Sequence, residues 1–267
     1  MPRALVIVPT YNERENLEGI VRRVLEAHER IDVLVVDDAS PDGTGEAAEA
    51  IAAREPRVRV LRRPAKLGLG TAYLAGFRIA IAEGYGAVFE FDADGSHPPE
   101  RLPEMLRRLD EGATLVVGTR WMPGGRTENW PLRRRLLSRG AAVYARALLR
   151  SRVRDITAGY RGYRTAFLAG RDLERIRSNG YSFQIEMSWL VERGDERIDE
   201  IPITFTERTE GASKMSGAII AEAVWRVAGW GLGILLADLR RPWLLPARAA
   251  RRRAARRAAP PAPGDAA

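Results

Sequence analysis

The chain has 267 residues, contains no cysteine and carries a formal net charge of +8. This length allows one large domain with appendages, and the lack of cysteine excludes disulfides, zinc–thiolate sites and thiol catalysis. The charge is concentrated beyond Leu239, where eight arginines stand against Asp265 alone. The rest of the chain is therefore nearly neutral, which argues against a nucleic-acid-binding body, because such a body needs a basic folded face.

The first half of the sequence predicts strands that alternate with helices. The opening residues, "MPRALVIVPTYNE", enter a strand pattern with no secretory signal, so a cytoplasmic location is expected. Strands are expected at residues 4–8, 32–38, 58–61, 87–91 and 114–118. Helices are expected between them, at residues 12–28 with Asn12 as N-cap, 44–56, 70–84 and 99–112. This alternation predicts an α/β fold whose mainly parallel sheet is covered by helices on both faces.

The second half is less regular. It predicts a helix at 133–150, a strand at 198–208 and an apolar helical stretch at 217–239. The uncharged part of that stretch, 227–237, is too short to span a bilayer, which takes about 20 residues. Tryptophans and arginines around it suit an amphipathic helix in the membrane interface, and packing on its own domain is the alternative; these residues are Trp225, Trp230, Trp243, Arg240 and Arg241. The expected organisation is a catalytic domain at 1–215, an amphipathic membrane-interface segment at 216–245 and a disordered Arg/Ala/Pro-rich tail at 246–267.

Two aspartates follow the fourth predicted strand, in "AVFEFDADGSHPPE". Asp92 and Asp94 are two residues apart, so in extended backbone they face the same side. Their mutual repulsion is removed if they share a divalent cation, and oxygen ligands favour magnesium or manganese. Ser96 could add a weak oxygen ligand, whereas His97 before two prolines is expected to be a turn residue. The alternatives are aspartates that cap the next helix, or a hydrolytic acid and base pair.

Further polar residues follow the first two predicted strands. In "PTYNERE", Tyr11 could stack on a base and Glu13 could accept hydrogen bonds from base or ribose. In "VVDDASPDG" an acidic residue could bind ribose hydroxyls. The spacing of "KLGLGTAYLAG" does not match the dinucleotide-binding glycine pattern, and no P-loop occurs, so a dehydrogenase or a P-loop ATPase is not indicated.

Basic residues form two groups. Arg120 follows the fifth predicted strand, and "ENWPLRRRLLSRG" sets Arg134 and Ser138 four apart on one helix face. In "ERTEGASK", Arg208 and Lys214 lie on a glycine-containing loop. Two phosphate-binding groups suit a reaction with one phosphate in the donor and another in the acceptor.

Together these motifs resemble those of a known family. The segments "PTYNERENL", "VVDDASPDGT", "KLGLGTAYLAGF", "DADGSHPPE", "GTRW", "ENWPLRRRLLSRGA" and "ERTEGASK" occur in an order similar to that of the dolichol-phosphate mannosyltransferases, also called polyprenol monophosphomannose synthases. These are inverting family 2 glycosyltransferases with the GT-A fold, a Rossmann-like sheet covered on both faces. The likeness spans roughly residues 3–220 and implies transfer of mannose from GDP-mannose to a polyprenyl phosphate, with Mg²⁺ or Mn²⁺.

The resemblance also implies roles for individual residues. Donor-binding positions would be Pro9, Tyr11, Glu13, Val36, Asp38, Asp92, Ala93, Asp94, Arg208 and Lys214. The metal would be held by Asp92, Asp94 and Ser96, although some relatives carry Gln in place of Ser96. The acceptor phosphate would bind Arg120, Arg134 and Ser138, and Asp94 and Arg120 would be the catalytic residues.

The family members with fused transmembrane helices have an extension that this chain lacks. We therefore expect a peripheral enzyme on the cytoplasmic, anionic face of the membrane, or one that works with a separate transmembrane partner. A phosphate acceptor is already anionic near neutral pH, so one inverting displacement without a general base is expected. Two alternatives are a glucosyltransferase or a related family 2 transferase that uses a UDP-sugar, and a non-catalytic nucleotide-sugar or RNA-binding module anchored by the tail.

Overall fold

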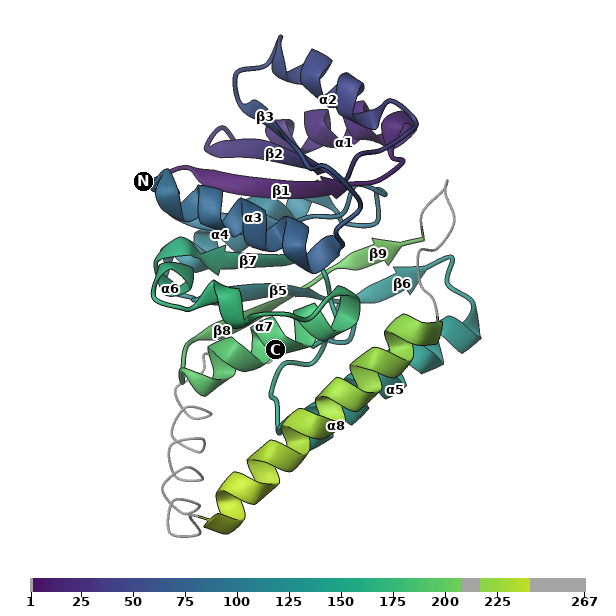
Figure 1. Ribbon diagram of the computed structural model, residues 1–267, viewed down its shortest axis with the longest axis vertical. Helices are drawn as coiled ribbons and strands as arrows, with labels where there is room; N and C mark the ends of the chain where they lie inside the picture. The colour runs from purple at the N-terminus through teal and green to yellow at the C-terminus, as the bar shows by residue number, and fades with distance from the viewer. Residues whose placement is uncertain (1, 208–216, 241–267) are drawn as a thin grey trace, which may run out of the picture.

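A computed structural model describes residues 2–207 and 217–240 (Figure 1). The strands are β1 (Ala4–Thr10), β2 (Ile31–Asp37), β3 (Val58–Arg62), β4 (Ala87–Glu90), β5 (Leu115–Thr119), β6 (Arg126–Glu128), β7 (Arg161–Arg164), β8 (Ile198–Pro202) and β9 (Thr204–Thr206). The α-helices are α1 (Arg14–Ala27), α2 (Thr44–Ala52), α3 (Leu69–Ala82), α4 (Leu102–Asp110), α5 (Leu132–Leu149), α6 (Thr165–Ala169), α7 (Gly180–Arg193) and α8 (Gly217–Arg240). Two short 3₁₀ turns, η1 (Pro99–Arg101) and η2 (Leu173–Arg175), complete the described part.

Within the described residues, seven strands form one sheet in the order β3-β2-β1-β4-β7-β5-β8. β7 runs antiparallel to β4 and β5, and the other neighbouring pairs are parallel. The predicted mainly parallel sheet is therefore confirmed, and its five expected strands are all present. β6 and β9 pair separately in a small parallel sheet at the carboxyl end of β5 and β8 (Figure 1).

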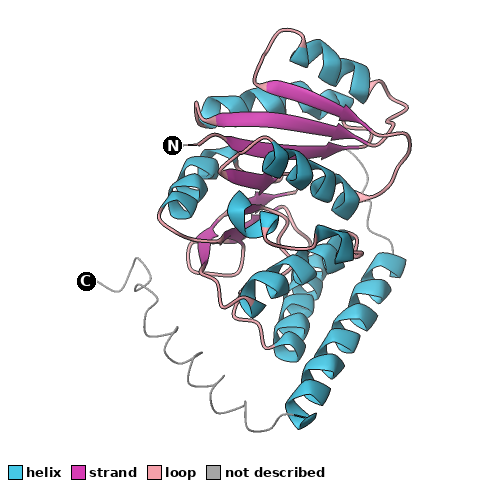
Figure 2. Ribbon diagram, turned by 60° about the vertical axis from the view of Figure 1, so that its left-hand side comes forward, coloured by secondary structure: helices cyan, strands magenta, loops and turns pink. Residues whose placement is uncertain are grey.

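Helices cover both faces of the sheet, as the alternation along β1 requires (Figure 2). Leu5 and Ile7 point into a core shared with α3 and α7, whereas Val6 and Val8 point into a second core shared with α1, α2 and α4. Since side chains alternate along a strand, a strand that is apolar at every position must be buried on both sides. The two hydrophobic cores lie on opposite faces and hold the carboxyl ends of the strands in place.

The N-terminus of α1 differs from the prediction. Asn12 is not the N-cap: it has a left-handed backbone with φ of 56°, and the N-cap is Glu13. The amide of Asn12 donates to Ser40 Oγ over 3.1 Å, and the amide of Glu13 donates to Thr44 Oγ1 over 3.0 Å. These contacts tie the turn after β1 to the turn after β2, so tertiary hydrogen bonds replace the expected local cap.

The strand predicted at 198–208 is interrupted. Ile203 is buried, and its amide donates to Thr119 O over 3.0 Å, so the chain leaves β8 there and begins β9. The short strands β6 and β7 and the helix α7 were not predicted, because their hydrophobic patterns are short or mixed with buried polar residues. Arg161 in β7 is an example: it is fully buried, and its guanidinium donates to the backbone carbonyls of Ile156, Ala158 and Gln184.

One face of α8 packs on the domain. Val227 is buried, and Trp230 stacks on Trp189 of α7 with ring centroids 5.8 Å apart. Tyr144 of α5 donates from its hydroxyl to the carbonyl of Val224 over 3.0 Å. No helix in the described ranges is long and apolar enough to cross a membrane. Of the tryptophans assigned to a membrane interface, Trp230 is thus packed inward, Trp225 is exposed, and Trp243 lies outside the described residues.

A pH effect on stability arises in β8. Burial raises the pKa of Glu200 to about 7, although its carboxylate accepts from the Arg154 amide over 2.8 Å. Glu200 therefore costs the folded protein no stability below about pH 4, where its carboxyl group is protonated in both the folded and the unfolded state. This stability is lost as the pH rises through 7, because the buried carboxyl group must then ionise. Relative to wild type, Glu200→Gln should therefore gain on the order of 2 kcal/mol in free energy of unfolding between pH 5 and pH 8. Urea unfolding of both proteins at the two pH values measures this gain, and an unchanged difference would contradict it.

Candidate functional site

The predicted donor-binding residues that the structure describes gather at the carboxyl edge of the sheet. β1, β2 and β4 are parallel neighbours, so their ends bring together the turns that start with Tyr11, Asp38 and Asp92. Pro9 and Val36 are paired in register across β1 and β2, just below this edge. A carboxyl edge formed by parallel strands is where ligands bind in open α/β sheets. The topology therefore supplies one location for the predicted donor-binding residues.

Asp92 is held from two sides. The Tyr73 hydroxyl donates to Asp92 Oδ1 over 3.2 Å, and burial keeps it a donor by raising the pKa of Tyr73 well above its usual value. The Asp92 amide donates to His97 Nδ1 over 3.0 Å, so the ring proton of neutral His97 is on Nε2, 3.6 Å from Asp92 Oδ2. Burial lowers the pKa of His97, which favours this neutral form. His97 is thus a buried residue that anchors the backbone of Asp92, and Asp92 itself stays partly open to solvent.

Asp94 and Ser96 form the turn after Asp92. Asp94 Oδ1 accepts from the Ser96 amide over 3.1 Å, and Gly95 between them has φ of 76°. The following 3₁₀ turn η1 has Pro98 as its N-cap and no side-chain cap. Neither aspartate therefore caps it, in contrast to the alternative in which the two aspartates cap the next helix. Ala93 is buried, and its side chain faces the core.

The oxygen atoms at this turn fit a divalent cation. Two partly exposed carboxylates stand next to the Ser96 hydroxyl, which is buried and has no hydrogen-bond partner. In the described part of the chain, no cluster of three or more His, Cys, Asp or Glu side chains could enclose a metal. A site with few protein ligands suits a cation that completes its shell with phosphate oxygens and water, as Mg²⁺ does in nucleotide sites.

Asp38 is placed differently from the expectation of an open ribose ligand. It is buried, and its carboxylate pairs with the Arg63 guanidinium and accepts from the amides of Leu67 and Gly68, both over 3.1 Å. Gly68 has φ of 97°, which explains why glycine stands at this point of the loop. The side chain of Asp38 therefore organises the loop between β3 and α3.

The same loop brings a cation to the edge. Lys66 Nζ lies 3.9 Å from the centroid of the Tyr11 ring, at a distance typical of a cation–π contact. Glu13 accepts from Asn16 Nδ2 over 3.1 Å. Lys66 was not among the predicted site residues, although it begins the "KLGLG" motif, because a single lysine in a loop carries no signal of its own.

Arg120 and Arg134 meet at one aromatic side chain. The Trp130 ring lies below both guanidinium groups, 5.3 Å from that of Arg120 and 4.1 Å from that of Arg134. Phe205 contacts Trp130 edge-on at 5.3 Å and the His97 ring at 5.8 Å. Phe205 thus links the aspartate turn to the pair of predicted acceptor-binding arginines, so the two predicted sites are adjacent.

Arg120 is paired with an acidic residue inside the protein. Its Nε and Nη2 each lie 2.7 Å from a different oxygen of Asp155, and both side chains are buried. Asp155 therefore fixes Arg120 in place. The sequence analysis did not identify Asp155, because nothing in "SRVRDITAGY" distinguishes this residue from a turn aspartate. Arg134 pairs with Glu207.

α5 begins beside these arginines. Its N-cap is Pro131 without a side-chain cap, and its first turns carry Arg133, Arg134 and Arg135. Basic residues at a helix N-terminus oppose the helix dipole, so their presence favours an anion at that point. Ser138, one turn after Arg134, is half-buried. Arg208 and Lys214 lie outside the described residues.

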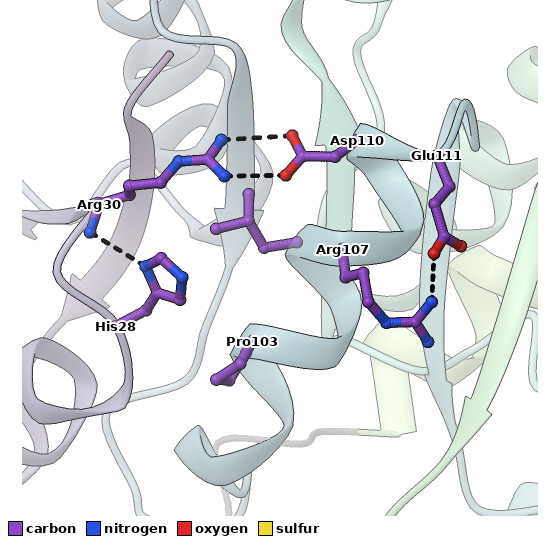
Figure 3. A pocket seen from close by; sticks show the side chains of 7 residues that line it. His28, Arg30, Pro103, Arg107, Asp110 and Glu111 are labelled. Atoms are coloured by element: carbon purple, nitrogen blue, oxygen red, sulfur yellow. Dashed lines mark hydrogen bonds and ion pairs between the residues drawn. The ribbon is translucent and has the colours of Figure 1, made fainter. Parts of the chain in front are cut away.

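A hollow elsewhere on the surface does not belong to this site (Figure 3). It lies at the amino edge of the sheet, between the turn before β2 and helix α4. Its charges are paired: Arg30 binds Asp110 at 2.8 and 3.2 Å, and Arg107 pairs with Glu111. Its position, away from the strand ends that hold the aspartates, separates it from the candidate site.

A family model described as "Glycosyl transferase family 2" matches residues 5–170 of the chain, which span β1 to β7 and contain the aspartate turn and Arg120. The chain belongs to glycosyltransferase family 2. Its mainly parallel sheet with helices on both faces is the GT-A fold that the resemblance implied, and the protein is an enzyme of this class.

Curated relatives of this glycosyltransferase are highly similar. The polyprenol monophosphomannose synthase of Mycolicibacterium smegmatis is 52% identical over 86% of this chain and 87% of that protein. The undecaprenyl-phosphate mannosyltransferase of Micrococcus luteus is 50% identical over 89% of this chain and 98% of that protein. The dolichol-phosphate mannosyltransferase of Pyrococcus furiosus is 37% identical over 84% of this chain, which spans 63% of that protein.

Solved structures support the fold. The glucosyl-3-phosphoglycerate synthase of Mycobacterium tuberculosis, crystallised with Mn²⁺, UDP-glucose and phosphoglyceric acid, superposes with a TM-score of 0.64. The likeness covers 85% of this chain and 80% of that one, at 19% identity. At this identity the comparison concerns the fold and not the substrates.

Proposed function

We propose that this glycosyltransferase moves mannose from GDP-mannose to a polyprenyl phosphate, giving polyprenyl-phosphate mannose and GDP. The observation that carries the proposal is the adjacency of two phosphate-directed groups, the Asp92 and Asp94 turn and the Arg120 and Arg134 pair, which Phe205 connects. The named activities of relatives up to 52% identical support both the sugar and the lipid acceptor.

The donor is bound at the aspartate turn. Asp92 and Asp94, with Ser96 as a weaker ligand, would hold a magnesium or manganese ion, for which their oxygen atoms fit. When bound, such an ion neutralises charge on the diphosphate leaving group. The Tyr73 hydroxyl orients the Asp92 carboxylate, and His97 anchors the Asp92 backbone by accepting from its amide. Tyr11 and Glu13 contact the nucleotide, as do the backbones of Pro9 and Val36, while Lys66, Arg208 and Lys214 bind donor phosphates.

The acceptor phosphate is bound by Arg120, Arg134 and Ser138. A phosphate monoester has a second pKa of about 6, so its oxygen is anionic near neutral pH and needs no general base. The arginines hold that oxygen toward the anomeric carbon of mannose, and the rigid Arg120–Asp155 pair lowers the entropy lost in reaching this orientation. The phosphate oxygen forms its bond to the anomeric carbon as the bond to GDP breaks, with inversion.

Product analysis tests the proposal. Purified protein is incubated with radiolabelled GDP-mannose, manganese and a polyprenyl phosphate, and the organic phase is then examined. Label in a mannosyl lipid that mild acid releases as mannose is the expected result. If labelled UDP-glucose gives the lipid product and GDP-mannose does not, the donor assignment is wrong. If neither donor gives a lipid product, transfer to this acceptor is contradicted.

The lipid acceptor also bears on location. We propose a peripheral enzyme on the anionic cytoplasmic membrane surface, held there by the C-terminal segment and the arginine-rich tail, with or without a separate transmembrane partner. Each arginine near such a surface contributes about 1 kcal/mol, and the contribution is screened by salt. Deleting residues 246–267 should therefore weaken liposome binding at least tenfold at low salt and much less at high salt. Equal loss at both salt concentrations would contradict an electrostatic role for the tail.

A further inference from the structure

The loop just before β7 connects the aspartate turn with Arg120. It begins at Asp155, whose carboxylate accepts from Arg120, and its Thr157 hydroxyl accepts from the same guanidinium over 3.4 Å. Its last residue, Gly159, lies beside Asp92: a Cβ placed on Gly159 would be 3.7 Å from Asp92 Oδ2. The loop therefore runs from the proposed acceptor-phosphate site to the proposed metal site, and a transferred sugar has to lie between these two.

The folded chain itself does not explain why glycine stands at position 159. Its φ is outside the left-handed region that favours glycine. Apart from its chain neighbours, a Cβ on Gly159 would meet no described atom closer than 3.7 Å, which is an ordinary van der Waals distance. By contrast, a Cβ on Gly162 would lie 2.4 Å from the Phe89 ring, so packing requires that glycine. At partly exposed Gly159, neither backbone conformation nor packing excludes a side chain.

A second polar group borders the space that Gly159 leaves open. Gln184 of α7, the only glutamine in the chain, has its amide nitrogen 3.9 Å from the position of a Cβ on Gly159. Gln184 is 3% exposed, and neither of its amide atoms has a hydrogen-bond partner of ordinary geometry among the described residues. A buried amide without a partner costs folding free energy. A ligand hydroxyl beside Gly159 would supply that partner.

Buried Glu90 is close to Gln184 but does not satisfy its amide. Burial raises the pKa of Glu90 to about 7, and Arg161 and Gln184 oppose this rise. Neither carboxyl oxygen of Glu90 makes a hydrogen bond of ordinary geometry within the described ranges. The backbone of Gln184 is held by Arg161, whose Nη1 donates to its carbonyl over 2.6 Å. α7 is thus fixed in position, while the amide of Gln184 keeps its capacity for a ligand.

The first turn of α7 borders the same space from the side of Arg120. Burial alone would lower the pKa of Arg120, but Asp155 and, more weakly, Tyr181 and Asp92 raise it through their electrostatic interaction with the guanidinium. Tyr181 therefore lies near the proposed acceptor-phosphate site, and its side chain is partly exposed. An aromatic ring in this position can pack against the apolar face of a sugar ring.

We infer that Gly159, Gln184 and Tyr181 form the subsite for the transferred sugar. A sugar hydroxyl takes the place of the missing side chain at Gly159, beside Asp92 and within reach of the Gln184 amide, and the sugar ring lies against Tyr181. The anomeric carbon is then between the diphosphate at Asp92 and the acceptor phosphate at Arg120, as the displacement requires. The inference rests on the proposed donor for the identity of the sugar.

Calorimetry with a free nucleotide and a nucleotide sugar tests this inference without any lipid acceptor. GDP and GDP-mannose are each titrated, with manganese, into full-length wild type, Gly159→Ala and Gln184→Met. GDP should bind all three proteins alike, because it carries no sugar. GDP-mannose should bind each variant about tenfold or more weakly than wild type. The reason is that alanine occupies the position of the hydroxyl, and methionine cannot form a hydrogen bond with it.

Thermal unfolding separates a binding role from a structural one. Gly159→Ala should be as stable as wild type or slightly more stable, because alanine restricts the unfolded chain. Gln184→Met should lose no stability, because it removes a buried amide without a partner. The matched control is Gly19→Ala in α1, where an added Cβ meets no described atom within 4 Å. This control should change the binding of neither GDP nor GDP-mannose.

The outcomes distinguish the subsite from the proposed reaction. Equal affinity of wild type and both variants for GDP-mannose would overturn the inference and leave the proposed transfer intact. A parallel loss of GDP binding would assign both residues to the nucleotide, and a large fall in Tm of both variants would assign them to folding; either result overturns the subsite. If wild type uses UDP-glucose instead, the donor assignment is wrong, and the same comparison with UDP and UDP-glucose decides on the subsite.

Discussion

Replacing Asp94 with alanine is expected to reduce the rate of mannosyl transfer roughly a thousandfold or more at saturating substrate and metal. The reason is that Asp94 would supply one of two carboxylates at the turn where the diphosphate leaving group is bound. Its carboxylate orders the turn through the Ser96 amide without capping the next element, so the loss should fall on catalysis and not on folding. Initial rates of lipid-linked mannose formation, measured with manganese, provide the test.

Calorimetry and a control variant make this test specific. GDP should bind wild type more tightly with manganese than without it, and Asp94→Ala should lose most of that difference. Glu29→Ala removes an exposed carboxylate between α1 and β2, at the amino edge, and should keep full activity. Full activity of Asp94→Ala with metal present would refute its assignment.

Replacing Asp155 with alanine is expected to lower the free energy of unfolding by about 3–5 kcal/mol, because it leaves the buried guanidinium of Arg120 without its partner. In a chain of this size such a loss corresponds to a fall in Tm of roughly 10 °C. Thermal and urea unfolding measure it directly. Transfer to the polyprenyl phosphate should also fall in the folded fraction, since Arg120 would no longer be held toward Trp130 and Arg134.

An exposed ion pair provides the control for the stability loss of Asp155→Ala. Glu18→Ala breaks the pair with Arg54, in which both side chains are more than half exposed, and should cost less than about 1 kcal/mol. If Asp155→Ala were as stable as Glu18→Ala, the Arg120–Asp155 pair would not be buried in solution. The proposal that this pair holds Arg120 rigidly for the acceptor phosphate would then be wrong.

The parallel part of the fold could be predicted from the sequence because each strand there is a short apolar run followed by a turn. "ALVIV" and "DVLVV" are examples, and both lie in the sheet as expected. β7 could not be predicted, because it begins with buried Arg161, whose guanidinium donates to the carbonyls of Ile156 and Ala158 just before the strand and to that of Gln184 in α7. The break at Ile203 depends on a hydrogen bond to Thr119 and is likewise a tertiary effect.

In the candidate site, the sequence identified groups that bear unusual chemistry but not the groups that hold them. Asp92 and Asp94 stood out as paired carboxylates after a buried strand, and they lie at the predicted edge. Tyr73 and His97, which hold Asp92, resemble ordinary core residues in sequence. Asp38 looked like an open ligand, yet its carboxylate is engaged by Arg63 and the amides of the next loop. The roles of Arg208 and Lys214 stay predictions.

The most direct test of the central claim is a crystal soaked with manganese and GDP and measured at a wavelength where manganese scatters anomalously. The proposal predicts an anomalous peak at the end of β4, in contact with carboxylate oxygens of Asp92 and Asp94 and with both phosphates of GDP. GDP bound elsewhere, or bound at this edge with no manganese peak and the two carboxylates turned away, would contradict it.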